Sequence, residues 1–277
     1  MVKDNDKWFY SGLYDENDNL IASWDELVNE YGIDVVKNYT EDDSSKPGEM
    51  IMSNKDLSKG TKLVIDSSVT AIGRNAFYNC TNLKEVVISN SGIGAAAFEY
   101  CTNLKEVTIG NYVTSIGDYA FRGCDKLNKL TIGNSIKSIG NYAFYGCTDL
   151  TSVNIPRNVV NIGKYAFRGC TSLKNIVIPN GVTIIGHSTF ARCTNLEKII
   201  IPDSVTSIED DAFYGCTNLN EIVLSNSITS IGSNVFYNCT NLKTINYLGT
   251  KEEWNSIDTN SAKIPSTITI NYNYVAQ

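Results

Sequence analysis

Eight cysteines and a single histidine are the residues of this chain best suited to metal binding or nucleophilic chemistry. The cysteines recur every 23 residues, apart from a first interval of 21, at positions 80, 101, 124, 147, 170, 193, 216 and 239. Zinc sites use cysteines two to four residues apart, and no such pair exists here. Cysteines of equal phase would lie at the parallel-strand spacing of about 4.8 Å, whereas a disulfide needs Cβ atoms about 3.8 Å apart. We therefore expect reduced, buried thiols that pack as small apolar side chains.

His187 is the lone histidine, and it stands at a repeat position that elsewhere holds Arg, Asp, Asn, Lys or Ser. A position that tolerates all of these argues against catalysis. The chain contains no phosphate-binding loop, zinc-protease motif or nucleophile elbow. The acidic runs at 41–43 and 209–211 lack the ligand spacing of calcium loops, so solvated carboxylates are the simpler interpretation and calcium binding the alternative. We expect no enzymatic activity, no cofactor and no metal.

A regular repeat surrounds every cysteine. A phenylalanine stands three residues before it and a leucine three residues after it, as in Phe144, Cys147 and Leu150. A fixed period of this length is typical of a solenoid, in which each repeat stacks on its neighbours. Each unit begins with an alternating apolar triplet such as residues 153–155, which predicts a strand whose middle side chain points outward.

A turn and a second short apolar pair follow each strand. A recurring glycine comes next and suits a positive φ or close packing; only Glu209 interrupts this glycine series. The Tyr-Ala-Phe-x-x-Cys segment then predicts a helical or 3₁₀ turn, because a gap of three places Phe and Cys on one face.

The apolar triplets continue one period beyond the phenylalanine and cysteine positions at each end, at 63–65 and 268–270. We therefore predict about ten turns, with the repeats at 61–249. An open solenoid end would expose core and unpaired strand edges, so both ends need covers.

Residues 1–60 are expected to form an amino-terminal cap and connector, made of a hairpin and a helix opened by a capping box at Ser23 and Glu26. Residues 250–277 are expected to form the carboxyl-terminal cap. There Thr250 and Glu253 predict a second capping box, and Trp254 is expected to cover the last turn.

Charge and hydropathy exclude several classes of partner. The net charge is -7, with 30 acidic against 23 basic residues, which disfavours nucleic acid and anionic membranes. The longest apolar runs are far too short to cross a bilayer, so no direct membrane insertion is expected. The first thirty residues contain no apolar stretch of signal-peptide length, which fits either a trimmed mature chain or a cytosolic one.

Written as "VTSIG-x-YAF-x-GCTNL-x-x-V-x-IP", the unit resembles the BspA-like, Treponema-type leucine-rich repeat family over residues 63–249. The segment "YLGTKEEWNSI" resembles the terminal coil of that family. The resemblance implies a right-handed solenoid with a parallel sheet on one face. It also implies a role in adhesion or protein recognition, often on a bacterial surface.

Stacking turns variable repeat positions into surface stripes, and two of these are candidate binding surfaces. The outward strand position supplies an apolar strip of Val177, Ile200 and Val223, which is typical of an interface, although β-propensity alone also explains it. The second stripe follows the phenylalanines and includes Arg122, Tyr145 and Arg168, and beside it run Tyr119, Tyr142 and Tyr165. Tyrosine and arginine are enriched at binding hot spots, but the same residues could form a cation–π ladder that only braces the turns.

The leading hypothesis is a non-enzymatic recognition module of a secreted or surface-displayed bacterial protein. Its partner would be a protein, for example a host matrix or bacterial surface protein, or a glycan. Two alternatives stay open: a structural spacer with no ligand of its own, and a cytoplasmic scaffold.

Overall fold

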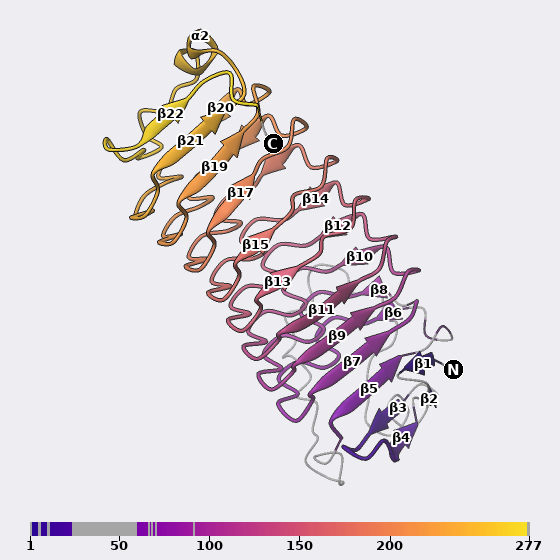
Figure 1. Ribbon diagram of the computed structural model, residues 1–277. Coiled ribbons are helices and arrows are strands. Elements are labelled where there is room, and N and C mark those ends of the chain that lie inside the picture. Colours follow the sequence, from indigo (N-terminus) through magenta and orange to yellow (C-terminus); the bar gives the residue numbers. More distant parts are fainter. Residues whose placement is uncertain are drawn as a thin grey trace, which may run out of the picture.

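The computed structural model describes residues 2–4, 7–9, 12–23, 60–65, 67, 69, 71–90 and 92–275. The chain winds into a β-solenoid of about nine turns with parallel sheets (Figure 1). The predicted repeat solenoid is therefore confirmed, whereas the count of ten turns and the capping role of the ends are not.

One face of the solenoid carries the main strands. They are β5 (Lys62–Ile65), β7 (Glu85–Ile88), β9 (Glu106–Ile109), β11 (Lys129–Ile132), β13 (Ser152–Val153), β15 (Asn175–Ile176), β17 (Lys198–Ile200), β19 (Glu221–Leu224) and β21 (Thr244–Tyr247). Paired strands are parallel and one repeat apart, so that Val107 lies opposite Leu130. The ladder is interrupted on both sides of the β13–β15 pair. Proline follows the strand region in these middle turns, at 156, 179 and 202, and proline has no N–H to donate to a neighbouring strand.

Short second strands form another row on the coil. The first five are β6 (Ala71–Ile72), β8 (Gly92–Ile93), β10 (Ser115–Ile116), β12 (Ser138–Ile139) and β14 (Asn161–Ile162). The other three are β16 (Ile184–Ile185), β18 (Ser207–Ile208) and β20 (Ser230–Ile231). The row divides into sheets of five and three strands, with the break between β14 and β16.

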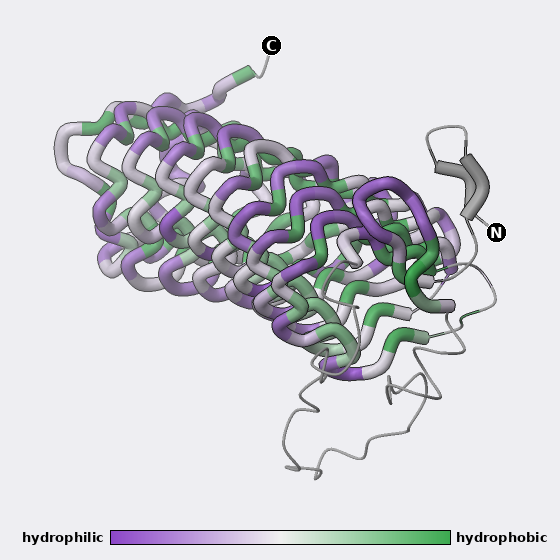
Figure 2. The backbone as a smooth tube through the Cα atoms, turned by 90° about the horizontal axis from the view of Figure 1, so that it is seen from below, coloured by the Kyte–Doolittle hydropathy of each residue, from purple (hydrophilic) through white to green (hydrophobic). Residues whose placement is uncertain are grey.

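The interior between the two rows consists of side-chain columns. Consecutive phenylalanine rings stack nearly parallel from Phe77 to Phe236, with centroids 5.1 to 6.3 Å apart. All eight cysteines are free and buried, and the thiol of Cys147 donates to the carbonyl of Phe121 at 3.3 Å. Figure 2 shows hydrophobic and hydrophilic stretches alternating along the turns. The predicted common interior of phenylalanine and cysteine columns is confirmed.

The Tyr-Ala-Phe-x-x-Cys segment is a run of turns rather than the helical or 3₁₀ turn that we predicted. Two residues of each segment adopt left-handed backbone angles, for example Tyr142 with φ 56° and Gly146 with φ 73°. Left-handed residues interrupt right-handed helical geometry. The recurring glycine before the segment serves close packing instead, because a Cβ on Gly117 would lie 2.7 Å from the carbonyl carbon of Gly94.

An antiparallel hairpin adjoins the first turn. Strand β3 (Gly12–Tyr14) pairs with β4 (Leu20–Ser23) and, on its other side, with β5. The hairpin predicted in this region is thus present. Strands β1 (Val2–Asp4) and β2 (Lys7–Phe9) form a separate antiparallel pair. The helix predicted after Ser23 and the polar connector lie outside the described residues.

A short helix, α2 (Lys251–Asn255), follows the last repeat strand. The predicted capping box is present, with Thr250 Oγ1 accepting from the Glu253 N–H and the Glu253 carboxylate accepting from the Thr250 N–H. Trp254 is buried, and its ring meets that of Tyr247 edge-on at 5.2 Å. Strand β22 (Thr269–Asn271) pairs with β21, but Ile270 rather than the expected Ile268 lies opposite Ile245. This last strand therefore does not continue the 23-residue period.

Candidate functional site

Two exposed apolar side chains lie on adjacent turns of the main strand row. Val177 is 73% exposed and Ile200 is 52% exposed. Both occupy the outward position of their turns, as the strand pattern predicted. We call this pair the apolar window. Its position was predicted from the sequence, and its role in binding stays a prediction.

The third member of the predicted strip, Val223, is only 2% exposed, so the prediction that it lies on the surface is wrong. A polar ladder crosses the sheet beside it. Lys198 pairs with Glu221 at 2.9 Å, and the Glu221 carboxylate accepts from the Asn246 amide at 2.7 Å. Asn246, itself buried, accepts in turn from Asn271 of β22 at 2.7 Å. The strand register places Val223 between Ile200 and the buried Asn246 of this ladder, which the repeat pattern could not reveal.

The outward position is also covered at the other end of the solenoid. Val64 and Val87 are buried in a small cluster with Tyr14 of the hairpin strand β3. The outward face is therefore closed near both ends, and the apolar window lies in its open middle section.

The predicted tyrosine and arginine stripe is brought together on consecutive turns. The rings of Tyr119 and Tyr142 stack at 4.8 Å, and those of Tyr142 and Tyr165 stack at 4.4 Å. We call these three residues the tyrosine column. All three are half-buried. Burial is the main cause that raises the pKa of Tyr142, with the neighbouring Tyr165 adding to it.

Arg122 contacts several side chains of its own chain. Its guanidinium lies 5.3, 5.6 and 5.5 Å from the ring centroids of Tyr100, Tyr119 and Tyr145. Its Nη1 also lies 2.9 Å from Oε1 of Glu99. Burial raises the pKa of the Glu99 carboxyl, and the Arg122 charge partly opposes that rise. These contacts favour a bracing role for Arg122.

Arg168 repeats this arrangement with fewer partners. Its guanidinium lies 5.6 Å from the ring centroid of Tyr165, and its Nη1 donates to Oγ of Ser188 at 3.1 Å. The stripe is thus assembled as the sequence predicted. Its two arginines are occupied by intramolecular contacts.

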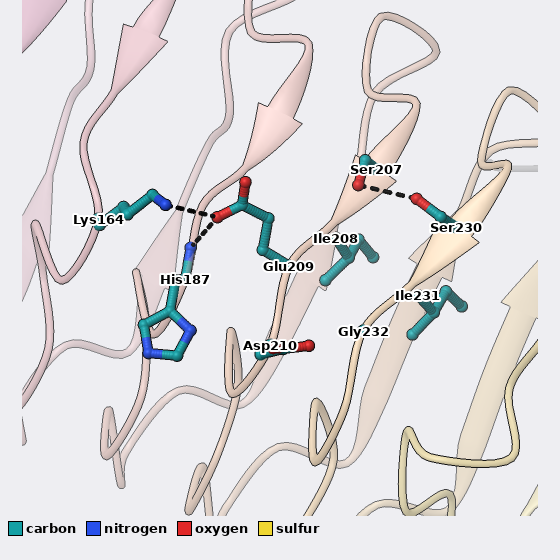
Figure 3. A pocket seen from close by; sticks show the side chains of 9 residues that line it. All are labelled: Lys164, His187, Ser207, Ile208, Glu209, Asp210, Ser230, Ile231 and Gly232. Atoms are coloured by element: carbon teal, nitrogen blue, oxygen red, sulfur yellow. Dashed lines mark hydrogen bonds and ion pairs between the residues drawn. The ribbon is translucent and has the colours of Figure 1, made fainter.

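A groove of about 360 Å³ lies on the second strand row, at a place that sequence reasoning did not select as a site (Figure 3). We call it the polar groove, and it is lined by Lys164, His187, Ser207, Ile208, Glu209, Asp210, Ser230, Ile231 and Gly232. The interruption of the glycine series by Glu209 was the signal in the sequence that marked it.

Nothing in the described part of the chain resembles a metal centre or a membrane span. Its one histidine, its cysteines and its carboxylates form no group of three or more with the arrangement of a metal site. No helix in the same part combines the length and apolar character needed to cross a bilayer.

Comparison with known proteins gives a consistent assignment. A family model described as "BspA type Leucine rich repeat region" matches six copies, over residues 53–139, 91–216 and 137–261. No curated protein matches the chain.

Solved structures provide further likenesses. A leucine-rich repeat protein of Treponema pallidum, TpLRR, is 29% identical with a TM-score of 0.56, and the match covers 64% of this chain and 86% of that one. A leucine-rich repeat protein of Bacteroides ovatus is 25% identical with a TM-score of 0.57, covering 76% of this chain and 69% of that one. A leucine-rich cell surface protein of Faecalibacterium prausnitzii is 27% identical with a TM-score of 0.40, covering 73% and 82%.

Proposed function

The chain belongs to the BspA-type leucine-rich repeat family, and we propose on that basis that it is a non-enzymatic recognition module whose apolar window binds a protein partner. Leucine-rich repeat domains generally mediate protein–protein interaction, and this family and fold are generally non-enzymatic. Proteins of this type are often surface proteins. This supports a secreted or surface-displayed location, where host matrix and bacterial surface proteins are the available partners.

The exposure of the apolar window is the observation that carries the proposal. Residues at the same outward position near both ends, Val87 and Val223, are buried. Val177 and Ile200 therefore stand out as large apolar side chains left in water. Full burial of such a side chain contributes about 1.5–3 kcal/mol, so two of them can supply the centre of a small interface.

The lysine on the same strand as Ile200 is already paired. Lys198 forms an ion pair with Glu221 one turn further on. Exposed ion pairs of this kind contribute little binding free energy. We therefore expect the partner to be recognised mainly by an apolar contact, with a polar rim around it.

The tyrosine column and its arginines receive a different role in this proposal. We infer that they brace the turns, because Arg122 contacts one carboxylate and three rings of its own chain. Truncation of such a residue would lower stability before it lowered affinity. An Arg168→Ala variant that loses binding while keeping its unfolding midpoint would instead place this stripe in the interface.

A capture experiment with matched variants tests the proposal. The wild-type chain, a Val177→Asp/Ile200→Asp variant and a Val160→Asp control would be immobilised and exposed to purified host matrix proteins and to bacterial surface extracts. Val160 is an exposed valine just before β14, so it controls for adding a charge to the surface. The affinity for each captured protein would then be measured with that protein in purified form.

We expect the window variant to bind at least tenfold more weakly, a change of about 1.4 kcal/mol, and the control to bind like the wild type. Equal binding by all three chains would exclude the window as the interface. Capture of no protein by any of them would favour the spacer or scaffold alternatives.

A further inference from the structure

The turn that contains His187 departs from the repeat more than its neighbours do. The preceding turn reads Tyr-Ala-Phe and the following one Asp-Ala-Phe, whereas this turn reads Ser188, Thr189 and Phe190. Arg192 stands where both neighbours have a glycine before the cysteine. Ser188 and Thr189 are buried polar residues. The position of Thr189 holds alanine in the other repeats, except for Val235 in the last one. Thr189 Oγ1 lies 2.8 Å from the carbonyl oxygen of Gly186 and 3.3 Å from that of Gly163. Local departures from an otherwise consistent pattern are expected at functional sites.

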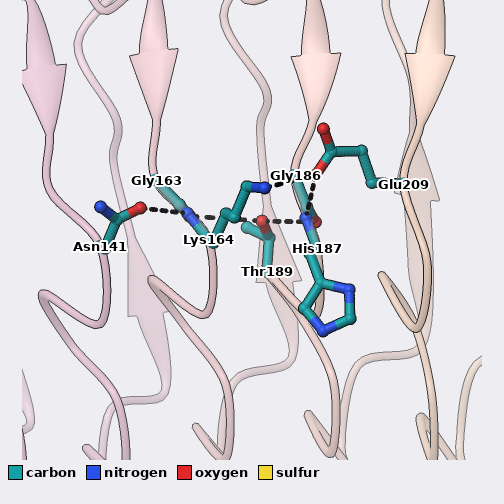
Figure 4. A network of polar contacts seen from close by, with 7 residues as sticks. All are labelled: Asn141, Gly163, Lys164, Gly186, His187, Thr189 and Glu209. Carbon is teal, nitrogen blue, oxygen red and sulfur yellow. Dashed lines mark hydrogen bonds and ion pairs between the residues drawn. The ribbon is translucent and has the colours of Figure 1, made fainter.

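Glu209 is the second departure, and the hydrogen-bond network around it explains its presence (Figure 4). On earlier turns the residue after the glycine accepts from the backbone of the next turn. Oδ1 of Asp118 accepts from the Asn141 N–H at 2.6 Å, and Oδ1 of Asn141 accepts from the Lys164 N–H at 2.9 Å. A lysine side chain can only donate, so Lys164 cannot continue this series to His187.

The carboxylate of Glu209, which lies on the following turn, accepts this backbone hydrogen bond in place of the Lys164 side chain. Its Oε2 accepts from the His187 N–H at 2.8 Å and lies 3.7 Å from Lys164 Nζ. The backbones of adjacent turns are packed less closely here than on earlier turns. A Cβ on Gly186 would lie 3.7 Å from the Lys164 backbone, whereas one on Gly140 would lie 2.5 Å from the backbone of Asp118. The break in the second strand row, between β14 and β16, falls at the same turns.

The polar groove lies beside these departures and draws its lining from four consecutive turns, Lys164 to Gly232. At about 4.8 Å per turn this is a length of about 14 Å. Its volume of about 360 Å³ lies in the range of small-molecule sites. In Figure 3, Ile208 and Ile231 lie between the polar residues, and both are buried.

The rim of the groove offers donors and acceptors together. Oδ1 of Asp210 accepts from the Ser233 N–H at 2.6 Å, and Oγ of Ser230 donates to Oγ of Ser207 at 2.8 Å. Within the part of the chain that the structure describes, this leaves Oδ2 of Asp210 and Oε1 of Glu209 as acceptors and the Ser207 hydroxyl as a donor. Lys164 and Glu209 neutralise each other, and the carboxylate of Asp210 adds a negative charge to the rim, which disfavours an anionic ligand.

We propose that the polar groove is a saccharide-binding site, which holds a short neutral segment of a glycan by hydrogen bonds to its hydroxyl groups. Each sugar hydroxyl both donates and accepts, which matches the mixture of carboxylate, hydroxyl and ammonium groups on the rim. A peptide would need apolar anchors or a free strand edge. The two isoleucines are buried, and β18 is already paired on both sides, with β16 and β20.

An array of defined oligosaccharides, probed with the full chain, tests this site. Hits would be titrated as free oligosaccharides against the wild type, Asp210→Ala and Glu209→Gly. The glycine variant restores the repeat pattern while removing one carboxylate. Glu197→Gln serves as a matched control, because Glu197 is an exposed carboxylate outside the groove.

We expect neutral oligosaccharides to bind the wild type and the control equally, and to bind each groove variant at least tenfold more weakly. The Val177→Asp/Ile200→Asp variant should bind them normally, which separates this site from the proposed protein interface. No oligosaccharide bound by the wild type, or unchanged binding by both groove variants, would overturn the proposal. Binding of a peptide in the groove, with no oligosaccharide bound by the wild type, would also overturn the proposal.

Discussion

Replacement of Phe144 by alanine tests whether consecutive turns share one interior. Phe144 is fully buried and stacks on Phe121 at 5.5 Å and on Phe167 at 5.4 Å. Truncation of a buried phenylalanine to alanine lowers the free energy of unfolding by about 3–5 kcal/mol. A ring pair contributes about 0.5–1.5 kcal/mol beyond the area that it buries. Since Phe144 loses two such pairs, we expect a loss at the upper end, about 5 kcal/mol.

Phe236 provides the matched comparison at the end of the phenylalanine column. It is also fully buried, but among the residues that the structure describes it stacks on Phe213 alone, at 6.3 Å. We therefore expect Phe236→Ala to lower the free energy of unfolding by about 3–4 kcal/mol. Urea titration followed by circular dichroism gives both values, and hydrogen exchange shows how far along the solenoid each loss extends.

Double variants make the test sharper. Phe144→Ala combined with Phe167→Ala should show a coupling of about 0.5–1.5 kcal/mol, because the two rings stack. Phe98→Ala combined with Phe213→Ala should be additive within about 0.3–0.5 kcal/mol, since several turns separate these rings. Equal losses for Phe144→Ala and Phe236→Ala, together with additivity in both pairs, would refute a shared column and the nearest-neighbour stacking it implies.

Two further predictions concern titratable groups. Burial raises the pKa of the Cys147 thiol well above its ordinary range, and that of Cys239 to about 12. Unfolded thiols ionise above about 9 while folded ones stay protonated, so the free energy of unfolding should fall as pH rises from 9 toward 12, by up to about 1.4 kcal/mol per thiol and pH unit. Thiol-reactive dye at pH 8 should label the unfolded chain only, and rapid labelling of the folded chain would contradict the burial. Arg122→Gln should lower the free energy of unfolding by about 2–3 kcal/mol, because it leaves the buried Glu99 carboxylate without its cation while Arg122 itself is one third exposed. Glu99 has a raised pKa, so protonation relieves this defect, and the loss measured by urea titration should shrink between pH 7 and pH 5. If Glu99→Gln lowered the free energy of unfolding by the same amount, the loss would come from breaking the ion pair and not from leaving the Glu99 charge uncompensated.

The repeat predicted most of the fold because each turn has the same local chemistry. The alternating triplet around Val107 marked a strand, and its 23-residue successor became the neighbouring strand. The spacing of Phe144 and Cys147 was enough to place both side chains in the interior. The capping box at Thr250 followed in the same way from residues that are close in the chain.

The turn geometry was less predictable. Tyr142 has no special sequence signal for a left-handed backbone, yet it adopts φ 56° because the turn must redirect the chain every few residues. The bracing contacts of Arg122 likewise depend on rings from three different turns. Sequence periodicity predicted that these side chains would be near one another, but not which rings and which carboxylate Arg122 would contact.

The sequence by itself determined the solenoid, its interior columns and the outward positions of Val177 and Ile200, since these depend on spacing along the chain. Only the tertiary structure decided that Val223 is covered and that Glu209 joins Lys164 and His187 at a groove. The physical reason is that exposure and hydrogen bonding depend on what the neighbouring turns and the chain ends place above each residue. Those contacts arise between turns, and the repeat period alone does not specify which side chain each residue will contact.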